Sequence, residues 1–232
     1  MASTFATNYT NSGGTNPSKS TSLIDYGSSS VNQTIDNSIS YRILQISGGM
    51  TKTLSGNTTI QNDLLINGGT LDVSTFSADR NSAGGSLVIA GGASLKIGGT
   101  NTFPADYSSH TLATTSTVEY YGANQTVASE AYGNLTLSSS SGSVVKTLPG
   151  TALNIAGNFT ASASAGTLSF TALNTMTIAG NVSLSASSTF EGSTFTHSLS
   201  GNWTNNGTFN GCSGSLNFNG AAATISGNGT NN

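Results

Sequence analysis

A four-residue word recurs along this chain and constrains its fold more than any other feature. The word is an aliphatic residue, one further residue, then Gly-Asn. Five copies occur: LSGN at 54–57, IAGN at 155–158, IAGN at 178–181, LSGN at 199–202 and ISGN at 225–228. Successive glycines of the last four copies are 21 to 26 residues apart. Repeats of about this length are typical of solenoids, in which each repeat packs only against its neighbours.

A longer repeat contains the short one. The related segments are LIDYGSSSVNQTI (23–35), VEYYGANQTV (118–127) and LNFNGAAATIS (216–226). The sequence after the first segment parallels the sequence after the second, with Lys52-Thr53-Leu54 matching Lys146-Thr147-Leu148. We therefore predict two long repeats, roughly 23–117 and 118–215, and the start of a third.

Apolar and polar residues alternate between the copies, as in TLSFTALNTMTIAG. Alternation with period two predicts half-buried strands, and Gly-Gly or Gly-Asn supplies the positive φ that tight corners need. No helical periodicity is sustained. We predict an all-β parallel β-helix (β-solenoid) over 21–232, with coils of about 20–25 residues. A string of antiparallel β-sandwiches, each about one long repeat in length, is the alternative.

The composition fits a thin-cored folded rod. Ser, Thr, Asn and Gly make up 127 of the 232 residues, and the net charge is only −3. The six Lys and Arg residues are scattered, which argues against a nucleic-acid partner, and no apolar stretch is long enough to predict membrane insertion. The single Cys212 is predicted to be buried or half-buried. Residues 1–20 are predicted to be disordered or to cap the first coil, and the chain reads as a fragment without its own targeting signal.

Four segments carry a family resemblance: TVEYYGANQTV, AYGNLTLSSSSGSVVKTLPG, LNIAGNFT and SLVIAGGASLKIGGTNTFPADYSSHTLATTSTVEY. They resemble repeat modules of giant secreted surface proteins of Bacteroidetes-type bacteria, over about residues 20–228. That family is adhesin-like, includes gliding-motility surface adhesins, and is exported by the type IX secretion system. The resemblance implies parallel β-helical modules at the cell surface or outside the cell. The chain is more distantly similar to filamentous-haemagglutinin and autotransporter β-helices.

The acidic residues do not predict an enzyme. No two of the nine are closer than seven residues in sequence, so no Asp-x-Asp pair exists for metal binding or acid–base work. The best local group is Asp72, Asp79 and Arg80, which we interpret as a solvated corner salt bridge. No motif for a metal, phosphate or other cofactor occurs. His110 and His197 are predicted to lie at the surface, and no cofactor is expected.

The aromatic residues have two interpretations. They either line a sugar-binding surface or alternate with polar residues and point into the core, and we favour the core. Tyr120 and Tyr121 are adjacent, so one of them must face outward from a strand; they are the candidate ligand-binding residues. The Asn-x-Ser/Thr triplets at Asn57, Asn134 and Asn158, and a fourth at Asn202, are expected by chance from this composition.

These observations predict a structural or adhesive repeat module of a bacterial cell-surface or secreted protein. The alternative is a carbohydrate-binding module or a polysaccharide-active β-helix. The expected partners are neighbouring repeats of the same protein. Two further partners stay open, namely a surface polysaccharide and end-to-end self-association.

Overall fold

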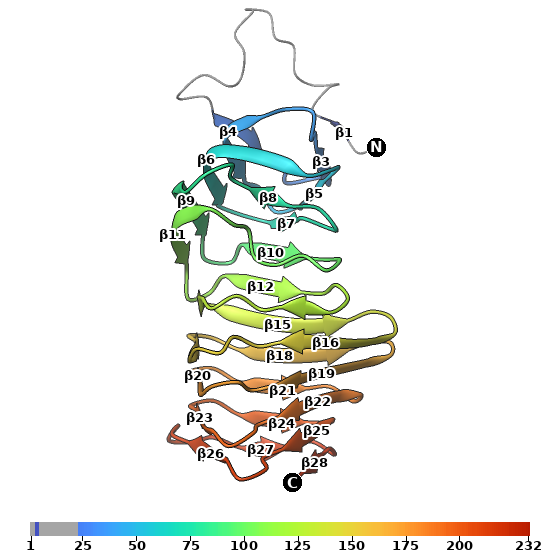
Figure 1. Ribbon diagram of the computed structural model, residues 1–232, viewed down its shortest axis with the longest axis vertical. Coiled ribbons are helices and arrows are strands. Elements are labelled where there is room, and N and C mark those ends of the chain that lie inside the picture. The colour runs from blue at the N-terminus through green and yellow to red at the C-terminus, as the bar shows by residue number, and fades with distance from the viewer. Residues whose placement is uncertain (1–2, 5–22) are drawn as a thin grey trace, which may run out of the picture. The chain divides into compact units, whose positions relative to one another are not determined.

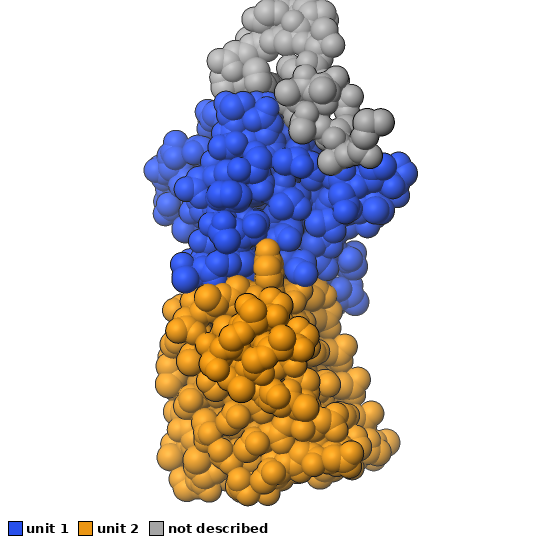
Figure 2. Space-filling model, turned by 90° about the vertical axis from the view of Figure 1, so that its right-hand side faces the viewer, with its two compact units in different colours: residues 1–116 blue, residues 117–232 orange. Residues whose placement is uncertain are grey.

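The computed structural model describes residues 3–4 and 23–232. Within these residues the regular structure is all β, and parallel strands stacked about 21 residues apart form about 10 β-solenoid turns (Figure 1). The predicted fold class is therefore confirmed. The chain divides into two compact units, Met1–Ser116 and Thr117–Asn232 (Figure 2). Except for Ser3–Thr4, the segment 1–20 predicted to be disordered or capping lies outside the described residues.

Two sheets run through the first unit. One contains, in spatial order, β1 (Ser3–Thr4), β3 (Gln33–Ile35), β5 (Thr51–Leu54), β7 (Thr70–Asp72) and β10 (Ser94–Ile97). The other contains β2 (Leu23–Tyr26), β4 (Tyr41–Ile46), β6 (Thr58–Ile66), β9 (Gly84–Ile89) and β11 (Tyr107–Leu112), and β8 (Ala78–Asp79) pairs with β6. The chain moves back and forth between the sheets, so neighbouring strands of one sheet come from successive turns.

The second unit has three sheets, and most turns add one strand to each. The first contains β12 (Thr117–Tyr120), β15 (Asn134–Ser139), β18 (Phe159–Ala163), β21 (Val182–Leu184), β24 (Trp203–Asn205) and β27 (Ile225–Ser226). The second contains β13 (Gln125–Thr126), β16 (Ser143–Thr147), β19 (Thr167–Thr171), β22 (Ser188–Glu191), β25 (Thr208–Asn210) and β28 (Thr230–Asn231). The third contains β14 (Ala131–Tyr132), β17 (Leu153–Ile155), β20 (Met176–Ile178), β23 (Thr196–Leu199) and β26 (Ser215–Phe218).

Strands of successive turns pair in parallel and in register. In the second unit, β15 pairs with β18 and β18 with β21, which places Leu135, Phe159 and Val182 in one column. This parallel pairing overturns the alternative of antiparallel β-sandwiches. The backbone N–H and C=O groups of each turn are satisfied by the turns on either side, so a thin-cored chain keeps its backbone hydrogen-bonded.

A column of aromatic rings fills the interior of the second unit. Phe170, Phe190 and Phe209 are register partners on β19, β22 and β25. The ring centroids of Phe170 and Phe190 are 4.9 Å apart and stacked, and those of Phe190 and Phe209 are 5.2 Å apart. The predicted core position of the aromatic residues is confirmed for Tyr120, Tyr132, Phe159, Phe190, Trp203 and Phe209, all of which are buried. Phe195 and Phe218 are half-buried.

The Gly-Asn word forms a corner of the second unit because its glycines stack directly on one another. The backbone N–H of Gly180 donates to the carbonyl of Gly157 at 2.8 Å, and Gly201 donates to Gly180 at 3.0 Å. A Cβ on Gly180 would lie 2.4 Å from the Gly157 carbonyl oxygen. These three glycines do not have positive φ, so close approach of the turns, rather than the predicted backbone conformation, requires glycine here.

The asparagine of the same word forms a ladder along this corner. The side-chain oxygens of Asn134, Asn158 and Asn181 each accept a hydrogen bond, at 2.8 Å, from the backbone N–H of the asparagine one turn later. Asn202 continues the ladder by accepting from the N–H of Thr224 at 2.9 Å. Each rung satisfies a corner N–H that no strand pairs, and such hydrogen bonds contribute roughly 0.5–1.5 kcal/mol each.

One copy of the word does not belong to this corner. Ile225, which opens the copy at 225–228, is the register partner of Trp203, and Trp203 directly follows the copy at 199–202. The spacing of 26 residues is therefore not the length of one turn, because Trp203 pairs with Ile225. Gly227 has φ +103° and Gly220 instead approaches the carbonyl of Ser200. A local match in sequence does not fix a position in the stack, because register is set by the neighbouring turn.

The corner column provides a test of the stacking. We expect Gly180→Ala to lower the free energy of unfolding by about 1–3 kcal/mol, since its methyl group forces the turns apart. Gly150→Ala is the matched control, because a Cβ there meets nothing within 4 Å. Urea unfolding followed by circular dichroism measures both. Equal stability of the two variants would contradict the proposed close approach.

Candidate functional site

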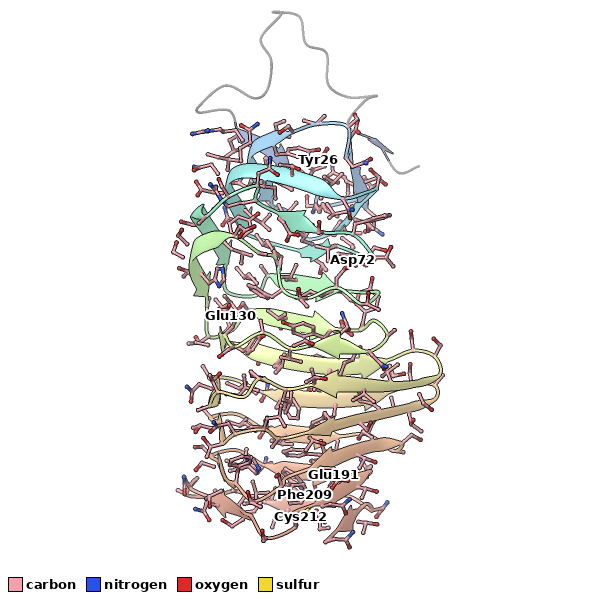
Figure 3. The ribbon with its side chains drawn as sticks, viewed as in Figure 1. Tyr26, Asp72, Glu130, Glu191, Phe209 and Cys212 are labelled. Atoms are coloured by element: carbon pink, nitrogen blue, oxygen red, sulfur yellow. The ribbon has the colours of Figure 1, made fainter. Side chains whose placement is uncertain are left out.

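The long repeat encodes a buried polar cluster that occurs once in each unit. Its first element is a pair of tyrosines from different strands, Tyr26 on β2 with Tyr41 on β4 and Tyr120 on β12 with Tyr132 on β14; Tyr26 is labelled in Figure 3. The hydroxyl oxygens of Tyr26 and Tyr41 are 2.8 Å apart, and those of Tyr120 and Tyr132 are 3.0 Å apart. All four rings are at most 2% exposed. Burial raises the pKa of Tyr120 to about 12 and raises that of Tyr132 well above its ordinary value.

The second element is a fully buried lysine. Lys52 Nζ donates to the carbonyls of Ser28 at 2.8 Å and Met50 at 2.9 Å. Lys146 Nζ donates to the carbonyls of Gly122 at 2.7 Å and Ala123 at 2.9 Å, and to Gln125 Oε1 at 2.6 Å. A buried ammonium is tolerated only when its donors are satisfied. Burial lowers the pKa of Lys52, and lowers that of Lys146 to about 8.

A glutamine on the adjacent turn lies beside each lysine and binds the same chain corner. Gln33 and Lys52 are register partners, and Gln125 and Lys146 are register partners in the same way. The corner N–H of Ser28 donates to Gln33 Oε1 at 2.9 Å, and the corner N–H of Gly122 donates to Gln125 Oε1 at 2.8 Å. The glutamine and lysine of the long repeat therefore hold one corner between two turns, whereas the tyrosine hydroxyls bind the backbone of Asp36 in the first unit and of Ala128 in the second.

Asp25 and Glu119 occupy the same position in the long repeat and have the same role outside the core. Asp25 accepts hydrogen bonds from the Ser47 hydroxyl at 2.9 and 2.7 Å. Glu119 accepts one from the Ser138 hydroxyl at 2.7 Å. Each acid thus binds a serine on the next turn. Every buried side-chain polar atom among the described residues has a hydrogen-bond partner, so the cluster is closed and its geometry is that of a structural lock.

The acid–arginine group at Asp72, Asp79 and Arg80 binds backbone rather than converging on a ligand. Asp72 accepts from the N–H of Ser74 at 2.8 Å, and Asp79 accepts from the N–H of Ala105 at 2.8 Å. The Arg80 guanidinium donates to backbone carbonyls, including that of Ser82 at 3.0 Å. The two acids stabilise corners one at a time. Among the described residues, no group of three or more His, Cys, Asp or Glu could hold a metal ion.

Two further residues differ from their predicted environments. His197 is buried, not at the surface, because it alternates with outward-facing neighbours on β23. Its Nδ1 accepts from the N–H of Met176 at 3.1 Å, so Nε2 donates to the Gly192 carbonyl at 2.9 Å. Burial lowers its pKa. Cys212 is exposed rather than buried, at a corner position with φ 53° (Figure 3). His110 is exposed, as predicted.

The Asn-x-Ser/Thr triplets follow from the fold. In the triplet at 158–160, the asparagine forms a ladder rung, Phe159 is buried, and Thr160 faces outward on β18. The triplets at 134–136 and 202–204 repeat these three roles, and Asn57 accepts from the N–H of Ser77 at 3.1 Å in the first unit. Each position of the triplet therefore has a structural requirement of its own.

The candidate ligand-binding pair divides between core and surface. Tyr120 is fully buried, whereas Tyr121 is half-buried. Tyr121 lines a hollow of about 200 Å³ together with Gly122, Ala123, Ser140, Ser141 and Val144. Tyr120 is the last residue of β12 and points inward, and Tyr121 directly follows the strand. Sequence reasoning missed the buried lysines and the asparagine ladder, although the repetition of Lys-Thr-Leu at 52–54 and 146–148 marked the first of these.

The cluster predicts how stability depends on pH. The folded pKa of Lys146 is lower than its unfolded value of about 10.5, so the unfolded chain binds more protons and stability rises between pH 8 and about 10.5. The pKa of Tyr120 is higher in the folded state, so its contribution is present below pH 10 and is lost above it.

We therefore expect the free energy of unfolding to be greatest near pH 10. Urea titrations at pH 7, 8.5, 10 and 11.5 measure it. Lys146→Met should reduce the rise between pH 8 and 10, with Lys52 retaining part of it. A stability that falls steadily from pH 7 to 10 would contradict the assignment.

Comparisons with known proteins give no family assignment. No family model, no curated protein and no solved structure matches the chain. Within the described residues, no helix is both long and apolar enough to cross a membrane. The site is therefore defined by its geometry: two closed structural clusters, one in each unit, and one surface hollow at Tyr121.

Proposed function

We propose that this chain is a structural and adhesive repeat module, acting as a β-solenoid spacer of a bacterial cell-surface or secreted protein. The observation that carries the proposal is that the same inter-turn contacts recur at each step. Backbone pairing, the Gly-Asn corner and the aromatic column each add one element per turn in the second unit. Turns can be added to such an assembly without any new chemistry, which is what a spacer requires.

The arrangement also suits a module under load. Pulling one turn from the next must break parallel hydrogen bonds in all three sheets of the second unit, together with its asparagine rung. The buried polar clusters add corner locks at Lys52 and Lys146. The assignment to a surface or extracellular compartment rests on the resemblance of the repeats to type IX secretion substrates, and gliding motility is one setting for that function.

The end of the second unit supports the proposed partnership with further solenoid turns. β26, β27 and β28 are each the last strand of their sheet. Beside them lies a hollow of about 340 Å³, lined by Trp203, Phe209, Leu216, Phe218, Ile225, Asn231 and Asn232. Ile225 is 64% exposed. Uncharged apolar side chains beside sheet edges resemble the inter-turn interface, so the fitting occupant is another β-solenoid turn.

A second candidate function is carbohydrate binding. It is favoured by one observation, the hollow beside the half-buried Tyr121, which combines an aromatic ring with serine hydroxyls. The binding of a surface polysaccharide would make the spacer adhesive along its length rather than only at its end.

Force spectroscopy tests the spacer function. We expect a polyprotein containing this chain between marker domains to unfold in steps, each releasing roughly one turn, or about 8 nm of extended chain. Gly180→Ala should lower the force of these steps, and Gly150→Ala should not. Loss of the whole chain at forces below those of the marker domains would be incompatible with a load-bearing spacer.

Sedimentation equilibrium tests end-on association. In the isolated protein the available occupant of the end hollow is a second copy, so we expect mass to increase with concentration. Ile225→Lys should suppress the increase, because it places a charge in the apolar interface. Val145→Lys is the control, since Val145 is 49% exposed on β16 and does not line the end hollow. Equal association of the two variants would exclude the end face.

A further inference from the structure

We propose that the hollow beside Tyr121 is a binding site for a single uncharged sugar ring. The proposal deepens the adhesive function proposed above and rests on it. The hollow measures about 200 Å³, below the range of roughly 300–1,000 Å³ for pockets that enclose drug-sized ligands. A hollow of this size fits one ring of a glycan, not a chain of several residues.

The chemistry of the lining suits a sugar. The Tyr121 ring offers a flat apolar face, on which the C–H face of a pyranose can stack. Ser140 and Ser141 are exposed and can exchange hydrogen bonds with ring hydroxyls, and Val144 closes the inner wall. None of the six lining residues is charged, which favours an uncharged ligand over a uronic acid or a sulfated sugar.

Tyr121 occupies a variable position of the long repeat, since the third segment has Asn219 there. The first word reads Asp-Tyr-Gly at 25–27, and the second reads Glu-Tyr-Tyr-Gly at 119–122. The first tyrosine of each segment is buried. The corner groups that bind glutamine and lysine belong to Ser28 in the first unit and to Gly122 in the second, so Tyr121 stands where the first segment has Gly27. The structural lock is complete without this residue in the first unit. The lock therefore does not require the Tyr121 ring.

The floor of the hollow is held rigid from inside. Lys146 Nζ binds the carbonyls of both Gly122 and Ala123, and Gln125 Oε1 accepts the Gly122 N–H. Tyr120 anchors the preceding residue position through the Tyr132 hydroxyl. The backbone that presents Tyr121 is thus fixed before any ligand arrives, which reduces the entropy lost on binding.

The opposite wall is a tight turn between β15 and β16. Ser140 and Ser141 lead into Gly142, which has φ +66°. That backbone conformation orients the serines toward the corner at 121–123, so two separate turns of the solenoid contribute to the hollow. Lys146 directs its ammonium toward backbone carbonyls and Gln125, and Glu119 binds Ser138. The two nearby charges therefore have partners of their own.

Saturation-transfer NMR on the full chain tests the proposal. The probes are glucose, galactose, mannose and N-acetylglucosamine, each free and as its short homo-oligomers, with glucuronic acid as the charged comparison. We expect saturation of at least one neutral sugar. A failure of all neutral sugars to take up saturation at about 10 mM would overturn the proposal, as would preferential binding of glucuronic acid.

Variants assign the binding to this hollow. Tyr121→Ala should weaken binding about tenfold or more, Tyr121→Phe should retain it, and Leu173→Ala, an exposed position elsewhere on the unit, should leave it unchanged. Circular dichroism and thermal unfolding verify that each variant is folded. Binding that survives Tyr121→Ala would place the site elsewhere and overturn the proposal.

Two readouts separate this proposal from the spacer function. Affinity for an uncharged ring should change less than about twofold between 50 and 500 mM NaCl, whereas a steep salt dependence would contradict an uncharged ligand. Stepwise unfolding under force should be unaffected by Tyr121→Ala. Stepwise unfolding without any sugar binding would support the spacer function and overturn only the sugar-binding proposal.

Discussion

The parallel pairing of each turn with the next is the constraint on which the rest of this structure depends. A strand at the edge of a turn has unpaired N–H and C=O groups until a neighbouring turn supplies partners in register. The register of this pairing determines which residue types each position tolerates. Inward positions form columns such as Leu135, Phe159 and Val182. Outward positions carry hydroxyl or amide groups, and the corner needs glycine because adjacent turns approach closely there. The unusual composition is a consequence of this pairing.

In the described part of the chain, polar side chains are found in the interior only where their hydrogen-bonding groups are satisfied by other groups of the protein. A lysine or tyrosine inside a narrow solenoid loses its hydration, so it must be matched by donors and acceptors from the turns that enclose it. Lys146 has three acceptors, and its glutamine partner lies on the preceding turn. The cluster takes its glutamine and its lysine from two consecutive turns. The third word has Phe218 and Ala223 where the second has Tyr120 and Gln125, and these residues cannot form the same lock.

Many polar side chains on this surface make hydrogen bonds that the repeat requires. A side chain that departs from the repeat is therefore a candidate for binding a ligand. The acids bind serines or corner N–H groups, and the ladder asparagines bind the next turn. Tyr121 is the departure we identify, since the first segment has Gly27 at the same position beside an equivalent corner. The rigid lock beneath it makes the position suitable for presenting a ring to a ligand. The spacer and the proposed sugar site therefore use the same cluster, one for strength and the other for preorganisation.

The sequence alone determined the all-β class, the turn length and the inward placement of residues such as Phe159 and Phe190, because alternation and spacing are local properties of a strand. It did not determine the partners across turns. The sequence match at 225–228 does not show its different place in the stack, and His197 and Cys212 lie in environments other than those predicted. The repeated Lys-Thr-Leu marks Lys146 without showing that it is buried. These outcomes depend on register and on corner conformation. Both are decided by the turn above and the turn below, so only the tertiary structure shows which side chains meet.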